Sequence, residues 1–286
     1  MSVATATDRG LSFKMQSSST QRFLAAHEPD LMHHWTSPGL SASDLTVFCD
    51  FDGPIIDVSE RYYQTYQLGL ADLQAVYEAM GEPIPIHVLS KTQFWQMKQD
   101  RVPDLEIAIR SGLQSHHVDY FLERVTEIVN QPALLHQDRL QPGVRWALSL
   151  LRSQGARLIL VTLRCQEQAL QILESYGLAD LFTDIRGTSD RDAAYRNQAE
   201  LKTRLLAQVI EDHSFSASAV DAAVMVGDTE ADILAGQSAG ISTIALTCGI
   251  RSANYLKRFQ PDRIHQDLLS TAHYLIYQQE LVRAFC

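Results

Sequence analysis

The chain has 286 residues, of which 45% are hydrophobic and 20% are charged, and its formal net charge is −10. This length allows roughly two domains with sizeable cores, and the acidic balance argues against nucleic acid or an anionic membrane as a partner, because phosphate groups are bound mainly by Lys and Arg. A negatively charged substrate would therefore need a local positive feature such as a metal ion.

Targeting signals and cysteine usage favour a cytoplasmic protein. No apolar run reaches the ~20 residues needed to span a bilayer, and residues 1–10 lack the basic and apolar stretches of a secretory signal. The cysteines lie far apart without a C-x-x-C pair, at Cys49, Cys165, Cys248 and Cys286. This spacing argues against a disulfide framework and against a zinc site, so we expect reduced thiols.

The amino-terminal part of the chain divides at residue 45. Residues 1–44 are rich in Ser, Thr and Ala, and we expect them to form an extension outside the core fold. Residues 45–49 are a short apolar run that is followed at once by the acidic sequence Asp50-Phe51-Asp52-Gly53-Pro54. A buried strand that ends at a polar loop explains this change.

Residues 60 to about 130 show a helical pattern. Apolar side chains recur at spacings of three and four, for example at Tyr62, Tyr66 and Leu70, and no convincing strand signal interrupts the stretch. Pro142 and Gly143 then end the pattern, since Pro breaks a helix and Gly frees the backbone. We expect an all-helical cap domain over residues 59–140, inserted into a core that is formed by residues 45–58 and 141–286.

Strands and helices alternate after residue 143. Apolar runs predict strands at 157–161, 222–226 and 241–246. Helical patterns lie between them, at 144–154, 166–176, 202–211 and 231–239. Short apolar strands that are separated by helices predict an α/β fold, with a Rossmann-like parallel sheet covered by helices on both faces.

Polar side chains lie just after three of the predicted strands: Asp50 with Asp52, Thr162, and Asp228 with Asp232. Each one alone is most simply a loop residue or a helix cap. Their joint placement indicates a common site, because open α/β sheets bind ligands beyond the carboxyl ends of their strands. Asp50 and Asp228 offer the hard oxygen ligands that Mg²⁺ prefers.

These motifs resemble those of the haloacid dehalogenase-like superfamily, in particular its phosphoglycolate phosphatase-like branch with a helical cap. DFDGPIID at 50–57 resembles the first motif, LVTL at 160–163 the second, Lys202 the third and VGDTEAD at 226–232 the fourth. The resemblance extends from residue 45 to about residue 265. It implies a Mg²⁺-dependent phosphatase in which Asp50 attacks a phosphate monoester and forms a phospho-aspartyl intermediate.

The resemblance also implies how the carboxylates divide the work. Asp50, Asp228 and the main-chain carbonyl of Asp52 would hold Mg²⁺. The Asp52 side chain would protonate the leaving alcohol and later deprotonate the attacking water. Asp232 would orient Lys202 rather than bind the metal.

The phosphate would be bound by a second set of residues, namely Gly53, Thr162, Leu163 and Lys202. The Thr162 hydroxyl and the Lys202 ammonium would donate to phosphoryl oxygens. Lys202 lies in a helical pattern, where lysines are commonly solvated, so Arg191, Arg196 and Arg204 stay open for its role. In the cap, Lys91, Lys98 and Arg101 are candidates to meet an anionic part of the substrate.

Several other functions share parts of this pattern. A phosphomutase of the same superfamily carries all four motifs and stays open, and so does a catalytically silent phosphate-binding regulatory protein. A 2-haloacid dehalogenase needs no leaving-group acid, so Asp52 argues against it. A phospho-receiver domain would place its acidic pair before the nucleophile. We expect a small phosphorylated metabolite as the substrate and a monomer or homodimer as the assembly.

Overall fold

The computed structural model describes residues 45–285, with side chains up to residue 278. The expected extension at 1–44 and Cys286 lie outside the described residues. No helix in the described part of the chain is both long enough and apolar enough to cross a membrane.

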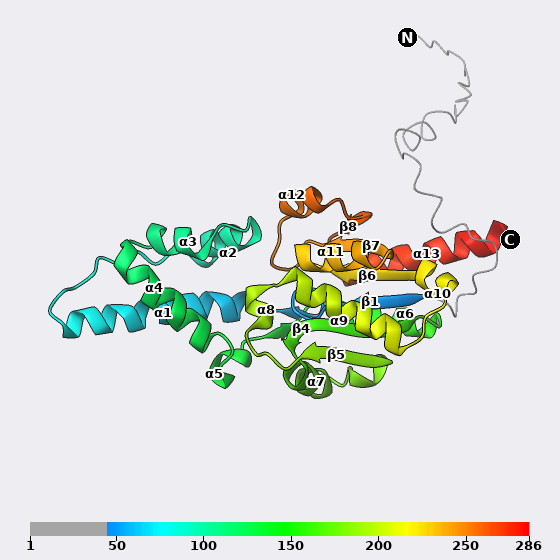
Figure 1. The fold of residues 1–286 in the computed structure, drawn as a ribbon, viewed down its shortest axis with the longest axis horizontal. Coiled ribbons are helices and arrows are strands. Elements are labelled where there is room, and N and C mark those ends of the chain that lie inside the picture. Colours follow the sequence, from blue (N-terminus) through cyan, green and yellow to red (C-terminus); the bar gives the residue numbers. More distant parts are fainter. Residues whose placement is uncertain (1–44, 286) are drawn as a thin grey trace, which may run out of the picture. The chain divides into compact units, whose positions relative to one another are not determined.

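A six-stranded parallel sheet forms the core, in the order β5-β4-β1-β6-β7-β8 (Figure 1). Its strands are β1 (Thr46–Cys49), β4 (Arg157–Cys165), β5 (Asp184–Thr188), β6 (Ala223–Gly227), β7 (Ser242–Leu246) and β8 (Arg263–His265). Strand β1 pairs with β4 on one side and with β6 on the other. The three strands that carry the predicted motifs therefore end side by side at one edge of the sheet.

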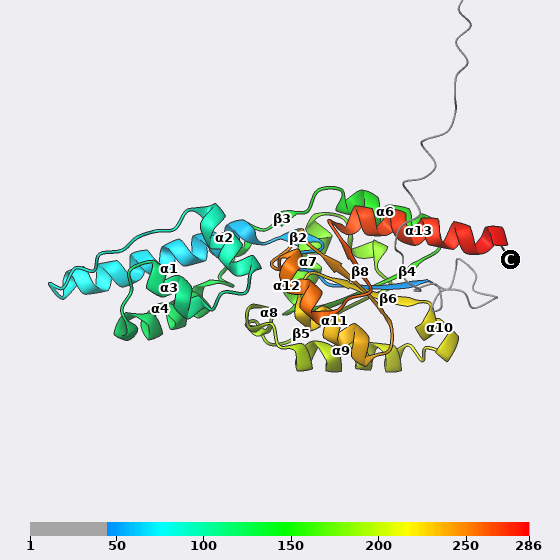
Figure 2. The same cartoon turned by 90° about the horizontal axis from the view of Figure 1, so that it is seen from above.

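Successive side chains of β1 enter different cores, as expected for a strand that is buried on both faces. Val47 and Cys49 belong to a cluster with α6 (Val144–Ser153), α7 (Gln166–Ser175) and α13 (Leu268–Phe285). Phe48 belongs to a second cluster with α9 (Ala199–Asp212) and α11 (Glu230–Ser238). Figure 2 shows helices on both faces of the sheet. The predicted Rossmann-like α/β fold is confirmed.

The helical insert follows β1 in the chain. Its helices are α1 (Ser59–Ala79), α2 (Lys91–Gln99), α3 (Asp104–Arg110), α4 (Ser115–Ile128) and α5 (Pro132–Leu135). Helix α1 buries the apolar stripe seen in the sequence. The ring of Tyr66 stacks on Phe94 with centroids 4.8 Å apart, and its hydroxyl accepts a hydrogen bond from the Leu89 N–H at 2.8 Å. Gly69 lets α4 approach closely, because a Cβ there would lie 3.0 Å from Val125.

The two connections between the insert and the core pair with each other. Strand β2 (Ile56–Asp57) and strand β3 (Arg139–Leu140) form an antiparallel ribbon, in which Ile56 lies opposite Leu140. The cap was expected to be all-helical over residues 59–140, but its last helix ends at Leu135 and Arg139–Leu140 are a strand. Two antiparallel segments that lie side by side satisfy their backbone groups by pairing, which explains the difference.

The strands at the two edges of the sheet were not predicted. Strands β5 and β8 consist of half-buried residues, so neither presents the continuous apolar run of a central strand. Strand β4 is longer than expected and continues through Thr162 to Cys165, with a register shift against β5 after Val161. The remaining short helices are α8 (Ala193–Arg196), α10 (Ala217–Asp221) and α12 (Ala253–Leu256).

Candidate active site

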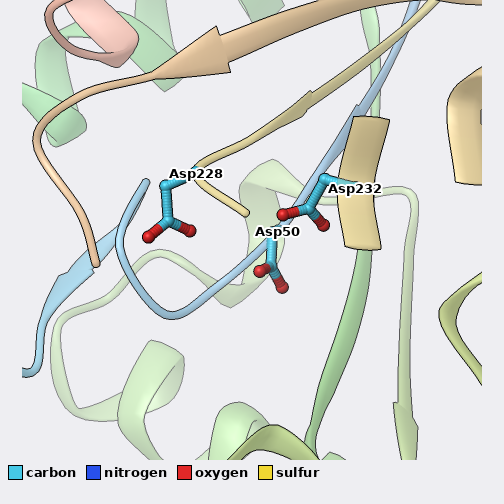
Figure 3. A group of neighbouring side chains, drawn as sticks. All are labelled: Asp50, Asp228 and Asp232. Atoms are coloured by element: carbon cyan, nitrogen blue, oxygen red, sulfur yellow. The ribbon is translucent and has the colours of Figure 1, made fainter. Parts of the chain in front are cut away.

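Three carboxylates meet at the carboxyl edge of the sheet (Figure 3). Asp50 follows β1 directly, Asp228 follows β6, and Asp232 lies in the first turn of α11. One carboxylate oxygen from each residue lies within 4.8 Å of the other two. Since β1 and β6 are neighbours in the sheet, their ends bring Asp50 and Asp228 together without any long loop.

Lys202 lies among these carboxylates. Its Nζ is 2.7 Å from Asp50 Oδ1 and 2.8 Å from Asp232 Oδ1, and its side chain is 1% exposed. Burial alone would lower the pKa of Lys202, but the charges of Asp232 and Asp50 raise it above its usual range. Of the basic residues that the sequence left open, Lys202 is thus in contact with Asp50, whereas Arg196 pairs with Asp190 and Asp192 on the surface.

Asp228 is held in one orientation by the backbone around it. Its Oδ2 accepts a 2.6 Å hydrogen bond from the Ile250 N–H. Gly53, with φ +94°, and Gly249 pack so closely that a Cβ at either position would overlap the Asp228 carboxylate. Its Oδ1 is buried and has no hydrogen-bond partner in the described structure. Gly53, expected to bind phosphate, lies against this carboxylate.

The electrostatics of these groups fit a divalent cation. Burial, Asp232 and Asp52 raise the pKa of Asp50 and Lys202 lowers it, and together these effects place it at about 7. Burial, Asp50 and Asp232 raise the pKa of Asp228 well above its usual range. Three buried carboxylates beside one ammonium leave negative charge uncompensated, and their hard oxygen atoms suit Mg²⁺. Asp50 and Asp228 are the residues that would hold it.

Asp232 is less suited to bind a metal, because both of its oxygens already have partners. Oδ1 contacts Lys202, while Oδ2 accepts hydrogen bonds from the Thr229 N–H at 3.1 Å and the Thr229 hydroxyl at 2.8 Å. The bond from the Thr229 N–H to the Asp232 carboxylate is one of the two bonds of a capping box at the start of α11. The local sequence thus fixes Asp232 where it can hold the Lys202 ammonium.

A cavity of about 40 Å³ lies over the carboxylates, between the core and the insert. The expected residues Asp50, Asp52, Thr162, Leu163 and Asp228 line it. The cavity is also lined by residues that belong to none of the motifs, among them Tyr62, Tyr195, Asn197 and Arg251. The Thr162 hydroxyl accepts a hydrogen bond from the Arg164 N–H at 3.1 Å, which leaves its own proton for another acceptor.

The three cap cations named from the sequence differ in their surroundings. Lys91 pairs with Glu60 at 2.7 Å and does not line the cavity. Lys98 lines the cavity, but its Nζ is 2.7 Å from Asp104 Oδ1, so this carboxylate balances its positive charge. Arg101 also lines the cavity, with φ 59°, a conformation that non-glycine residues rarely adopt.

Arg101 shares its partner with a core residue. Its Nε is 3.2 Å from Glu230 Oε1, and the Nε of Arg251 is 2.9 Å from Oε2 of the same carboxylate. Two guanidinium groups therefore face one carboxylate, which leaves one positive charge beside the cavity. Only the Arg101 part of this cluster could be named from the sequence, because Arg251 lies in a loop without a motif.

Asp52 has an unexpected partner in Arg164. Arg164 Nη2 is 2.7 Å from Asp52 Oδ1, and its Nε donates to Oδ2 at 3.2 Å. The Arg164 side chain is only 3% exposed. The sequence offered no signal for this contact, because the strand was expected to end at residue 161. Strand β4 instead continues to Cys165 and buries Arg164, and a buried guanidinium requires a carboxylate nearby.

Comparisons with known proteins identify the family of this chain. Residues 45–240 match the family described as haloacid dehalogenase-like hydrolase. The chain belongs to this family. A match of this extent includes all four motifs, so the family resemblance that the sequence indicated is confirmed.

Proteins similar to this chain include named relatives and solved structures. The chain is 25% identical over 226 residues to the pyrophosphatase PpaX of Halalkalibacterium halodurans, covering 77% of this chain and 91% of that protein. It is 30% identical over 226 residues to a phosphoglycolate phosphatase of Aliivibrio fischeri, covering 76% and 90%. A subfamily IA hydrolase of Geobacter sulfurreducens has a similar fold, with 19% identity and a TM-score of 0.53 over 82% of this chain and all of that one.

The raised pKa of Asp50 predicts that the metal-free hydrolase loses stability as pH rises. The folded state binds more protons than the unfolded state between the usual value of 3.8 and about 7, so the free energy of unfolding falls across this interval. In EDTA, wild type should lose more stability between about pH 5 and about pH 7.5 than Asp50→Asn, which cannot ionise. Urea unfolding at both pH values measures this difference.

Mg²⁺ provides the companion measurement. It should raise the melting temperature of wild type more at the higher pH, because the cation competes with protons for the carboxylates. Equal pH dependence of the two proteins in EDTA would contradict the assigned ionisation of Asp50.

Proposed function

We propose that the protein is a Mg²⁺-dependent phosphatase that hydrolyses a small phosphate monoester through a phospho-aspartyl intermediate on Asp50. The observation that carries the proposal is the contact of Lys202 with Asp50. The carboxylate of Asp228, which could bind a metal ion, lies beside them, and Asp52 and Thr162 line the cavity above. The family match and the names of the relatives support a phosphatase.

The contacts of Asp50 suggest how the first step proceeds. Lys202 occupies Oδ1 and favours the ionised carboxylate, so Oδ2 is the oxygen that attacks phosphorus. The bond from phosphorus to the ester oxygen breaks, and Asp52 donates its proton to the leaving alcohol. The product of this step is an acyl phosphate on Asp50 together with the free alcohol.

The second step releases phosphate. Water attacks the phosphorus atom of the acyl phosphate, Asp52 accepts a proton from that water, and the bond to Asp50 breaks. Thr162 donates its hydroxyl proton to a phosphoryl oxygen in both steps, which stabilises the developing charge. Asp50 and Asp228 would hold Mg²⁺, which would supply the positive charge that offsets repulsion between the carboxylates and the phosphate.

The substrate that fits the cavity is small and carries a second negative group. The cluster of Arg101, Arg251 and Glu230 leaves one positive charge beside the cavity. Pyrophosphate and phosphoglycolate, which the names of two relatives mention, both have a second anionic group next to the phosphate.

A cytoplasmic location agrees with the three described cysteines, all of which are free.

The other functions considered have less support. Asp52 lines the cavity, which disfavours a dehalogenase that needs no acid, and a silent binding protein would have no use for Lys202 buried against Asp50. A phosphomutase shares these residues, and no observation favours it over hydrolysis.

Loss of the nucleophile should abolish turnover. Asp50→Asn should lower kcat by about 10³-fold or more, because the amide cannot form the acyl phosphate. Phosphate release from a panel of small phosphate esters, measured with Mg²⁺, checks this, while circular dichroism controls for folding. A folded Asp50→Asn protein with wild-type turnover would disprove the mechanism.

Removal of the metal should also stop turnover. EDTA should abolish wild-type activity, and Ca²⁺ should restore it poorly, because Ca²⁺ prefers more ligands at longer distances.

Arg101 should determine substrate preference. Arg101→Gln removes the surplus charge, and should lower kcat/KM for a doubly anionic ester by about tenfold, the effect of losing one charge-assisted contact. Hydrolysis of 4-nitrophenyl phosphate, which lacks the second anionic group, should change little. Arg110→Gln is a matched control, since Arg110 pairs with Glu106 on the exposed face of α3. Equal losses on both substrates would show that Arg101 does not bind the second group.

A further inference from the structure

Three buried charged side chains connect Asp52 to the cap and form a charge ring with it. They are Arg164 from the core, Asp138 just before strand β3, and Arg61 from helix α1. We propose that this charge ring makes Arg61, Asp138 and Arg164 positioning residues for Asp52, so that acid–base catalysis depends on the placement of the cap. The inference rests on the proposed function, in which Asp52 is the acid and base.

Arg164 forms the core side of the charge ring. Its guanidinium contacts both oxygens of Asp52, at 2.7 Å and 3.2 Å. Its Nη1 is 2.8 Å from Asp138 Oδ2. One planar group thus bridges two carboxylates that are far apart in the sequence, and its five donors have a fixed geometry. The orientation of Asp52 is therefore tied to the position of Asp138.

Arg61 forms the cap side. Its Nε donates to Asp138 Oδ1 at 2.8 Å, and its Nη2 is 3.7 Å from Asp52 Oδ2. Its Nη1 donates to the Val129 carbonyl at 3.2 Å and to Asn130 Oδ1 at 3.0 Å. The guanidinium is therefore fixed within the helical insert. Arg61 lies in the first turn of α1, shortly after β2, and Asp138 directly precedes β3, so both lie next to the two connections through which the insert joins the core.

Burial explains why the ring acts on Asp52 rather than on substrate. The Arg61, Arg164 and Asp138 side chains are 2–3% exposed, whereas Asp52 is 16% exposed and lines the cavity. The two arginines lie behind Asp52, and Asp52 is the member that reaches the reacting groups. A general acid must lie within hydrogen-bond reach of the proton's destination, so small rotations of its carboxylate matter.

Stability alone is a weak reason for this ring. Two arginines and two aspartates have no net charge, and buried ion pairs are often replaceable by well-packed apolar residues without loss of stability. What apolar residues cannot supply is a fixed direction for a carboxylate. A shift of the cap moves Arg61 and Asp138 together, and Asp52 then loses the alignment that Arg164 transmits.

The test uses a charge-balanced variant, Arg61→Met with Asp138→Asn, which keeps the neutral Arg164–Asp52 pair. The value of kcat/KM should fall about tenfold or more for an alkyl phosphate, part of the roughly 10²–10⁴-fold that acid catalysis contributes. With 2,4-dinitrophenyl phosphate, whose leaving group needs no proton, kcat/KM should fall less than about threefold. Equal losses on the two esters would overturn the inference.

A matched control pair is available within the cap. Arg124→Met with Asp72→Asn removes an ion pair of 2.7 Å between α4 and α1, away from the cavity. It should leave kcat/KM unchanged for both esters. A selective loss on the alkyl phosphate in this control would also overturn the inference, because it would show that any weakening of the cap gives the same pattern.

A double-mutant cycle separates this inference from the proposed function. Asp52→Asn alone should lose alkyl phosphate hydrolysis; if it does not, the acid role itself fails. In the Asp52→Asn background, the ring variant should cause no further loss, since the group that it positions is gone. If the ring variant lowers kcat/KM by the same factor in both backgrounds, the acid role stands but the positioning role of the charge ring is rejected. If the ring variant does not fold, Arg164→Lys is tested in the same cycle with the same two outcomes, since it keeps the positive charge but loses the planar guanidinium group.

Discussion

The burial of like charges at the end of the sheet is the constraint on which the rest of the site depends. Asp50, Asp228 and Asp232 have carboxylate oxygens within 4.8 Å of one another, and Lys202 balances only part of their charge. Such an arrangement is unfavourable unless a cation joins it. The fold nevertheless enforces it, because central strands and closely packed glycines leave the Asp228 carboxylate no other position.

The loop after β7 links this charged centre to the cap. Ile250 of that loop donates its N–H to Asp228, while the neighbouring Ser252 N–H bonds to the Gln99 carbonyl of the cap at 2.8 Å. Arg251 lies between them and bonds both Glu230 and the Lys98 carbonyl. Three consecutive residues thus support the proposed metal ligand Asp228, carry a charge beside the cavity and contact the cap.

The sequence predicted what depends on neighbouring residues and missed what depends on distant ones. Asp50 and Asp228 were found because each follows a continuous apolar strand, a pattern local to a few residues. Strands β5 and β8 were missed because their residues are half-buried. Arg61 and Asp138 are 77 residues apart, and Arg164 and Asp52 are 112 apart, so no spacing rule connects them. In a helical pattern, Arg61 looks like any solvated arginine.

Two clusters of charged residues join the cap to the core, and they differ in net charge. One surrounds Asp52 and the other lies beside the cavity. The ring is neutral when Asp52 is ionised, whereas the cluster of Arg101, Arg251 and Glu230 has one surplus positive charge. A surplus charge suits a surface that meets an anionic substrate, since it attracts the ligand that neutralises it. Two unbalanced positive charges behind Asp52 would instead strongly oppose the protonation that the proposed acid role requires. Pairing each arginine of the ring with an aspartate gives Asp52 a fixed direction, while Asp138 offsets the second positive charge.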